Sequence, residues 1–123
     1  MAATYQEKNL TGPAFVAVGP TDVYVAPAAS GAYVRTVITN IQIVNTDAVN
    51  PSKIGVGVRR GAAGAAAGNR IISENGLGSL GPGGQYTQDK VGIVLQPGDI
   101  IYAVADVANR STLTVNGVER LTQ

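Results

Sequence analysis

The chain has 123 residues, which is enough for one domain with its own core but not for two. Only 14% of the residues are charged, against roughly 25% in an average globular protein, and the net charge is +1. The sequence has no basic cluster, which argues against nucleic-acid binding, and no long charged run, which argues against disorder. Its 16 glycines fall between apolar runs, which is typical of an all-β chain with many turns.

Cysteine and histidine are both absent. Their absence removes disulfides, thiolate zinc sites, the cysteine nucleophile and the imidazole base. We therefore expect a protein that is not an enzyme and that holds no metal ion and no cofactor. The first residues lack the basic and apolar regions of a signal peptide, and no apolar run approaches about 18 residues, so we expect no membrane span and synthesis in a cytoplasm.

Residues 1–12 are polar and show no periodicity. Such a segment is typical of a terminal arm that becomes ordered only when it docks on another surface. The sequence thus predicts an N-terminal arm over 1–12 and one β-sandwich domain over 13–123. About 12 extended residues span roughly 40 Å, so the arm is long enough to reach a neighbouring subunit and serve attachment.

Two strand regions follow the predicted arm. Between Phe15 and Pro27, Gly and Pro interrupt the apolar runs, which predicts two short strands or one broken edge strand, because prolines cannot donate to a central ladder. The segment "YVRTVITNIQIVN", Tyr33 to Asn45, is the strongest strand of the chain. Apolar residues occupy both of its parities, which indicates a bulge, a crossing between sheets or burial on both faces.

The middle of the chain combines clear strand patterns with glycine-rich loops. "SKIGVGVRR" alternates, which predicts a strand with Ile54, Val56 and Val58 toward the core and its other face toward solvent or a partner. Residues 61–69 are rich in Ala and Gly and predict a loop, with a short helical turn as the alternative, since each glycine costs about 1 kcal/mol in a helix. "RIISE" predicts one short strand before a glycine-rich loop.

The last third of the chain contains three predicted strands. "QYTQDKVGIVLQ" and "DIIYAVADV" are joined through Gln96-Pro97-Gly98-Asp99, which suits a type II turn, so we expect these two strands to pair antiparallel. "STLTVNGVER" predicts a last strand with Leu113 and Val115 inward. No helix of ordinary length is visible. The fold class is therefore all-β, a single Greek-key or jelly-roll-like β-sandwich of about seven to nine short strands.

Motifs that carry chemistry are weak in this sequence. Gly76, Gly78 and Gly81 match the dinucleotide fingerprint G-x-G-x-x-G, but Pro82 and two glycines follow where a helix is needed, so we interpret the segment as a loop. The carboxylates stand mostly beside turn residues, where aspartate usually caps a turn. Their spacing matches neither a calcium loop nor a pair of catalytic acids.

Contacts with other proteins are the functional alternative to chemistry. The few aromatic residues are spread along the chain, so no aromatic cluster of the kind that binds carbohydrate is visible. Adjacent arginines at a strand end are most often solvated, and the functional alternative is a salt-bridging contact with an acidic partner surface. Six residues are the candidates for such interfaces: Tyr5, Lys8, Phe15, Arg59, Arg60 and Arg70.

Two segments carry a resemblance to a known family. "DVYVAPAASGAYVRTVITNIQIVNTDA" and "VLQPGDIIYAVADVANRSTLTVNGVE", which together span roughly Asp22 to Glu119, resemble small virion proteins of tailed bacteriophages. That family has a "-lYtvPaG-" opening, a "v-ksi-v-N" strand and an "l-pGD-I-" turn that leads to "-vtv-GvE". This chain differs from it by Ala28-Ala29-Ser30 before Gly31 and by the insert at 61–69.

The resemblance implies a small all-β domain that serves as a capsid decoration (cement) protein or as a part of a tail or fibre, commonly as a trimer. We therefore expect a homotrimer that binds the major capsid protein, or another virion protein, and that resides in the virion after synthesis in a bacterial cytoplasm. A surface poor in charge favours the same conclusion, because subunits in contact bury it. A glycan-binding sandwich and, less so, a sandwich hydrolase are the alternatives from other classes.

Overall fold

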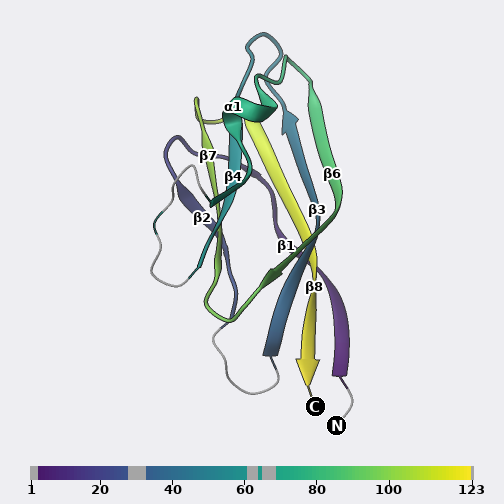
Figure 1. Cartoon of the computed structure of the whole chain (residues 1–123). Helices are drawn as coiled ribbons and strands as arrows, with labels where there is room; N and C mark the ends of the chain where they lie inside the picture. The colour runs from purple at the N-terminus through teal and green to yellow at the C-terminus, as the bar shows by residue number, and fades with distance from the viewer. Residues whose placement is uncertain (1–2, 28–32, 61–63, 65–68, 123) are drawn as a thin grey trace.

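The computed structural model describes residues 3–27, 33–60, 64 and 69–122. Eight strands in this part of the chain form two four-stranded sheets that pack face to face (Figure 1), which confirms the predicted all-β sandwich. In spatial order, sheet A contains β1 (Ala3–Phe15), β8 (Ser111–Thr122), β3 (Tyr33–Asn45) and β6 (Gln85–Leu95). In spatial order, sheet B contains β2 (Thr21–Val25), β7 (Ile100–Ala105), β4 (Ile54–Arg59) and β5 (Arg70–Ile72).

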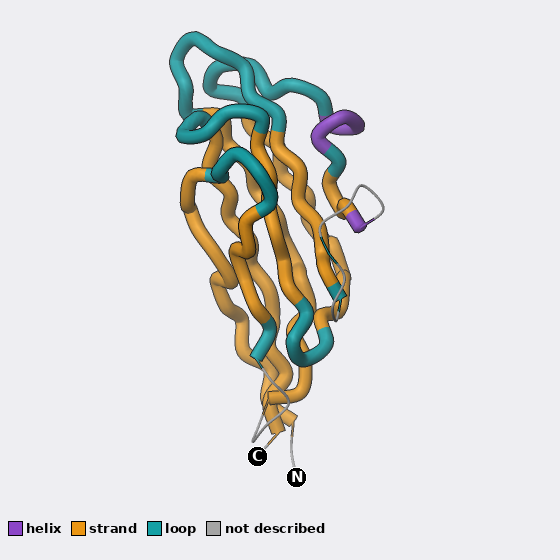
Figure 2. Tube along the Cα trace, turned by 90° about the vertical axis from the view of Figure 1, so that its left-hand side faces the viewer, coloured by secondary structure: helices purple, strands orange, loops and turns teal. Residues whose placement is uncertain are grey.

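The strands pair in a nested order. β1 pairs with β8, β2 with β7, β3 with β6 and β4 with β5, always antiparallel, and β3–β8 and β4–β7 pairs complete the two sheets. Apart from β4 and β5, consecutive strands lie in different sheets, so most connections cross the sandwich. Ala3 pairs with Thr122 at one end of the molecule, and long loops cover the other end (Figure 2).

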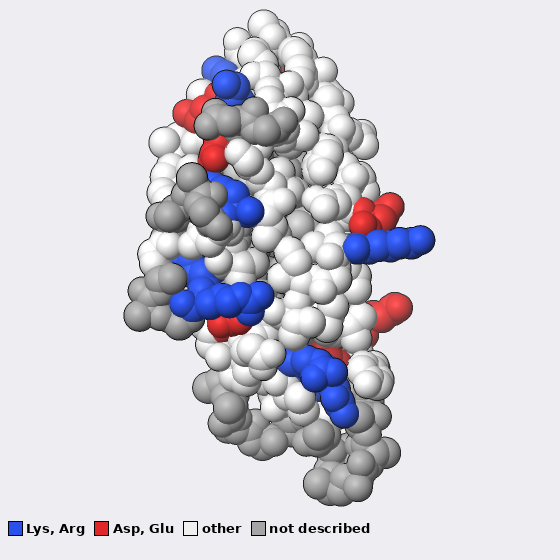
Figure 3. All heavy atoms as spheres, in the orientation of Figure 1, with Lys and Arg blue, Asp and Glu red and all other residues white. Residues whose placement is uncertain are grey.

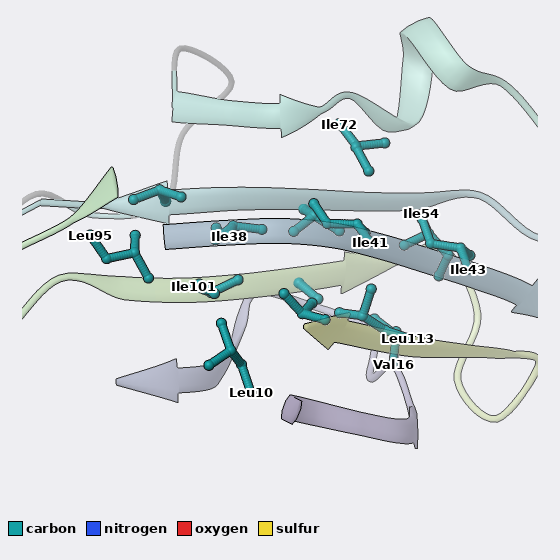
Figure 4. Close-up of a cluster of buried hydrophobic side chains, with 14 of the residues drawn as sticks. Leu10, Val16, Ile38, Ile41, Ile43, Ile54, Ile72, Leu95, Ile101 and Leu113 are labelled. Atoms are coloured by element: carbon teal, nitrogen blue, oxygen red, sulfur yellow. The ribbon is translucent and has the colours of Figure 1, made fainter. Parts of the chain in front are cut away.

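The core lies between the sheets and consists mainly of branched aliphatic side chains (Figure 4). On β3 the buried positions change parity, since Ile38 and then Ile41 and Ile43 are fully buried. The change occurs at a shift of register between Ile38 and Asn40. The predicted bulge is thereby confirmed, and Leu113 and Val115 point inward from β8 as predicted.

The N-terminal segment corrects one prediction. Residues Ala3–Phe15 form β1, which pairs with β8 without a shift from Ala3 to Asn9, so this segment is a strand of the sandwich and not an arm that awaits a partner. As an edge strand it needs one neighbour only, and between Tyr5 and Phe15 only Leu10 is buried. Shifts of register after Asn9 and again before Ala14 interrupt the remainder of the strand.

The turn at Gln96 to Asp99 corrects a second prediction. Gly98 has a φ of +85° and the Asp99 amide donates to the Gln96 carbonyl at 3.0 Å, as a type II turn requires. However, β6 and β7 lie in different sheets and do not pair. The turn is instead bonded to the end of β2: the Gly98 amide donates to the Ala26 carbonyl, and the Ala26 amide donates to the Asp99 carbonyl.

The second face of β4 corrects a third prediction, since we expected solvent or a partner there. Gly55 and Gly57 are buried, because side chains of the same sheet and of α1 (Glu74–Leu77), a single helical turn, cover this face. A Cβ at Gly55 would lie 2.5 Å from the Glu74 carboxylate, and one at Gly57 would lie 2.4 Å from the Tyr102 ring.

The remaining predictions have mixed outcomes. β5 confirms the short strand of "RIISE", and β2 is an edge strand of sheet B, as its flanking prolines predicted. Phe15 ends β1 and does not begin a new strand. A turn, with the Gly84 amide bonded to the Gly81 carbonyl, follows the glycine motif in place of a helix. Except for Gly64 and Asn69, the Ala- and Gly-rich segment 61–69 lies outside the described residues, as do residues 28–31.

Candidate functional site

The six predicted interface residues do not form one surface. Three of them lie on β1 at the edge of sheet A: Tyr5, Lys8 and Phe15. The other three lie on sheet B, at the end of β4, directly after it and at the start of β5: Arg59, Arg60 and Arg70. Tyr5 and Phe15 are 65% and 56% exposed, so sheet A presents its aromatic candidates to the outside.

The arginine candidates are paired within the chain. Arg59 forms an ion pair with Asp22 on β2. Arg60 places Nη1 2.6 Å from Asp99 Oδ2 and donates from Nη2 to the Val94 carbonyl at 3.0 Å. These pairs hold β2, β4 and the turn after β6 together. An acidic partner surface therefore has to compete with Asp22 and Asp99 for these guanidinium groups.

Arg70 belongs to a side-chain cluster over the glycines of β4. Its Nη1 donates to the Tyr102 hydroxyl at 2.5 Å, its guanidinium carbon lies 5.2 Å from the centre of the Tyr102 ring, and its Nε lies 3.2 Å from Glu74 Oε1. The Tyr102 hydroxyl donates to Asn69. Tyr102 is fully buried on a face that the sequence assigned to solvent or a partner. The sequence feature that could have indicated this covered face is the pair of glycines, Gly55 and Gly57, that alternate with the apolar residues of β4.

A polar chain crosses the core between the two sheets. Lys8 Nζ lies 3.3 Å from Glu119 Oε2, and the Tyr24 hydroxyl donates to the same oxygen at 3.1 Å. The Thr36 hydroxyl lies 2.9 Å from the Tyr24 hydroxyl and 2.6 Å from that of Tyr33. Because each hydroxyl has one proton, Tyr33 donates to Thr36 and Thr36 to Tyr24. Thr36 is fully buried and Glu119 nearly so.

The surroundings of this chain of hydrogen bonds raise the pKa values of two tyrosines, Tyr24 and Tyr33. Burial is the main cause that raises the pKa of Tyr24 above its ordinary value, and the negative charge of Glu119 adds to it. Burial likewise raises the pKa of Tyr33, again with a contribution from Glu119. Both tyrosines are therefore held in their neutral, hydrogen-bonding form.

The outer face of sheet A is a broad, regular surface of four strands. Register aligns its side chains in rows across the strands, and the row beside Phe15 contains Thr112, Val44 and Gln85. The next rows toward Ala3 contain Thr114, Gln42 and Thr87; then Asn9, Asn116, Asn40 and Asp89; then Glu7, Val118, Val37 and Val94. The last row contains Tyr5, Arg120 and Arg35. We call this surface, from Phe15 to Tyr5, the neutral face, because amide, hydroxyl and aliphatic side chains make up most of it and its two acidic and two arginine side chains balance in charge.

One row of the neutral face is hydrogen-bonded from edge to edge. Asn9 Nδ2 donates to Asn116 Oδ1 at 3.1 Å, and Asn116 Nδ2 donates to Asn40 Oδ1 at 3.3 Å. Asn40 Nδ2 then donates to Asp89 Oδ1 at 2.6 Å. This amide ladder runs across β1, β8, β3 and β6 in one direction and ends on a carboxylate, so each bond polarises the next.

A cleft of about 460 Å³ adjoins the amide ladder. Its lining residues come from three strands of sheet A: Glu7, Lys8, Asn9, Thr39, Asn116, Gly117 and Val118. Thr39 lies at the bulge of β3 and donates from its hydroxyl to the Asn116 carbonyl at 3.2 Å. The inner side of Gly117 is filled, since a Cβ there would meet Leu10, so the cleft opens on the outer face.

Charged side chains are few and mostly paired in the described part of the chain. Figure 3 shows them as scattered groups with wide uncharged areas between. Ion pairs engage five of the nine basic and five of the eight acidic residues: Lys8–Glu119, Arg59–Asp22, Arg60–Asp99, Arg70–Glu74 and Arg110–Asp47. The exposed large apolar side chains are Tyr5, Phe15, Val18, Val25 and Val49.

The aspartates of the described part of the chain stabilise loops and do not gather into a metal site. Across residues 3–27, 33–60, 64 and 69–122, no three potential metal ligands of the His, Cys, Asp or Glu type come together. None of the helices described is long and apolar enough to cross a membrane. Aspartates instead stabilise loops: Asp47 Oδ1 accepts the amides of Val49 and Asn50 at 2.8 and 2.7 Å, and these bonds lower the Asp47 pKa.

Comparison of the chain with family models, with curated proteins and with solved structures gave no match. The resemblance to phage virion proteins therefore rests on the two segments quoted from the sequence. In the structure these segments supply β2, β3, β7 and β8, which are both central strands of sheet A, one central strand of sheet B and the edge strand β2.

Proposed function

We propose that this chain is a non-enzymatic structural protein of a bacteriophage virion, a capsid decoration (cement) protein that binds and stiffens the head lattice. The observation that carries the proposal is the neutral face, a four-stranded surface mainly of amide, hydroxyl and aliphatic side chains with the exposed Phe15 and Tyr5 near its two ends. Its apolar side chains gain free energy when another protein covers them.

The neutral face suits contact between proteins more than contact with water. Threonine, valine, asparagine and glutamine predominate on it, and four strands keep it in place through backbone hydrogen bonds. A rigid surface loses little conformational entropy when it is covered. A homotrimer, or a trimer seated on the major capsid protein, buries the end of this face around Phe15, and the protein then resides in the virion after synthesis in the bacterial cytoplasm.

The order of the strands supports the same proposal. We propose that the sandwich is a jelly roll, because β1 pairs with β8, β2 with β7, β3 with β6 and β4 with β5, as when one long hairpin rolls up into two sheets. Jelly rolls of eight strands occur in viral capsid and lectin domains. This support is an analogy at the level of the fold, and it adds to the resemblance of the two quoted segments.

The paired arginines and the absent basic cluster make nucleic acid an unsuitable partner for this surface. No three potential metal ligands come together within the described residues, and the sequence has neither cysteine nor histidine, which favours a structural role. Contacts with protein subunits are then the interactions that the neutral face supports best.

Light scattering after size exclusion tests the oligomer, and electron microscopy of virions with and without the protein tests its place. We expect a trimer at micromolar concentration and added density on the head. Phe15→Asp, which puts a charge on the neutral face, should weaken both, whereas Val49→Asp, on a loop and 77% exposed, should not. A clean monomer that leaves heads unchanged contradicts the proposal, and density on the tail assigns the protein to a tail or fibre instead.

A further inference from the structure

The cleft on sheet A has a chemistry that subunit packing does not require. Its volume of about 460 Å³ lies within the range of sites for small ligands, about 300–1,000 Å³. Its walls combine the Glu7 carboxylate, the amides of Asn9 and Asn116 and the hydroxyl of Thr39. Val118 provides an aliphatic surface between them. Polar groups of three kinds therefore converge around one apolar area.

The polar groups of the cleft suit a ligand that both donates and accepts hydrogen bonds. The part of the chain that the structure describes places no hydrogen-bond donor on the Glu7 carboxylate, which can accept from two hydroxyls at once. Within the amide ladder, Asn116 uses one N–H and one oxygen contact, so a second N–H stays available for a ligand.

The charge that lines the cleft disfavours anionic ligands. Glu7 lines the cleft, and the ammonium group of Lys8 lies 3.3 Å from the buried Glu119 carboxylate, on the core side of β1. A phosphate or carboxylate ligand would lie beside the Glu7 carboxylate, whereas the nearest outward cation, Arg120, stands one row away and lies over the Tyr5 ring. A neutral ligand rich in hydroxyl groups meets no such penalty.

An exposed aromatic ring stands next to the cleft. Tyr5 lies two residues before Glu7 on the same face of β1, and its ring is 65% exposed. The guanidinium carbon of Arg120, opposite Tyr5 on β8, lies 5.9 Å from the ring centre. The register places Tyr5 one row from Glu7, which lines the cleft, and the ring face away from Arg120 can contact the C–H groups of a sugar ring.

We propose that this cleft binds a neutral hexose unit of a glycan, with Glu7, Asn9 and Asn116 on its hydroxyls and the Tyr5 ring along one side. The ladder makes Asn116 a rigid group, because Asn40 and Asp89 fix its amide from the far side. The cleft lies toward the Tyr5 end of the neutral face and the proposed subunit contact lies around Phe15 at the other end, so sugar binding requires neither a trimer nor a virion.

Amide NMR of the full chain, titrated with hexaoses of glucose, mannose, galactose and N-acetylglucosamine, tests the site. We expect at least one of the four to cause saturable shifts in the side-chain amide signals of Asn9 and Asn116. Glu7→Ala and Tyr5→Ala change exposed side chains and keep the fold, and each should weaken that binding at least fivefold. Asp89→Ala should weaken it two- to threefold through Asn40.

Thr87→Ala is the matched control, since Thr87 lies on the same face near the opposite edge and should leave the affinity unchanged. The proposal is overturned if none of the four hexaoses shifts these signals, or if Glu7→Ala and Tyr5→Ala bind as tightly as the wild type. Broadening of the same signals with protein concentration, in the absence of sugar, would identify the cleft as a contact between copies and would also overturn it.

Discussion

Tyr102 lies against the backbone of Gly57, so closely that a Cβ at position 57 would come 2.4 Å from the Cζ of the ring. The two residues are register partners on β7 and β4, and the glycine gives the ring room to be fully buried on the outer side of sheet B. Arg70 then lies over the ring and joins β5 to β7.

Gly57→Ala should therefore destabilise the protein by about 1–3 kcal/mol, because the new methyl group displaces a ring that sits among buried neighbours. Chemical denaturation measures the change. Gly81→Ala is the control: a Cβ there meets nothing within 4 Å, so its effect should stay within about 0.5 kcal/mol. Equal effects of the two substitutions would show that the contact with Tyr102 is not the cause.

Asn45 joins the loops that cover one end of the sandwich. Its fully buried side chain donates to the carbonyls of Asn50, Leu80 and Gly81 at 2.9, 2.9 and 3.1 Å, and its Oδ1 accepts the Asp47 amide. Asn45→Ala leaves these groups without partners and should cost about 2–4 kcal/mol. Thermal melts of Asn45→Ala and of the wild type measure this loss of stability, and a loss below about 1 kcal/mol would contradict the prediction.

Tyr24 makes the stability of the folded protein decrease at alkaline pH. Its pKa is raised in the folded state by burial and by Glu119, whereas the unfolded chain has the ordinary tyrosine value of about 10. Above about pH 10 the unfolded chain loses this proton while the folded chain retains it, so stability falls as pH rises. Denaturation midpoints across this range should fall less steeply in Tyr24→Phe than in the wild type. An unchanged slope would contradict this assignment.

Short sequence patterns predicted the features of the fold that depend on neighbouring residues alone, such as turns and bulges. Apolar residues on both parities of "YVRTVITNIQIVN" indicated the bulge of β3 as one of three alternatives, and Pro97-Gly98 predicted the type II turn. The membership of β6 and β7 in different sheets could not be predicted, because a turn constrains four residues and leaves open which distant strands pair with its flanks. β1 was missed because an edge strand with a single buried leucine lacks the alternation of apolar residues.

The candidate sites depend even more on distant contacts. Asn9 and Asn116 are 107 residues apart, and only the pairing of four strands places them in one row with Asn40 and Asp89. The predicted interface residues Tyr5 and Phe15 share the neutral face, whereas Lys8, two positions before Leu10, forms an ion pair with Glu119. A sequence reveals such residues, but it does not reveal the register that brings them together.

Deletion of the first nine residues tests whether this segment is a separate arm or a strand of the sandwich. An arm that orders only on binding can be removed without effect on the isolated protein. Ala3 to Asn9, however, pair with β8, and Lys8 neutralises a Glu119 carboxylate whose side chain is only 7% exposed. Deletion of residues 1–9 removes these pairings and leaves a nearly buried charge without its cation, so we expect a loss of about 2 kcal/mol or more, roughly 5–10 °C in Tm. Lys8→Met should lose only the part due to the ion pair, because it keeps the strand. An unchanged melt after the deletion would mean that the segment contributes nothing to the sandwich and would restore the arm.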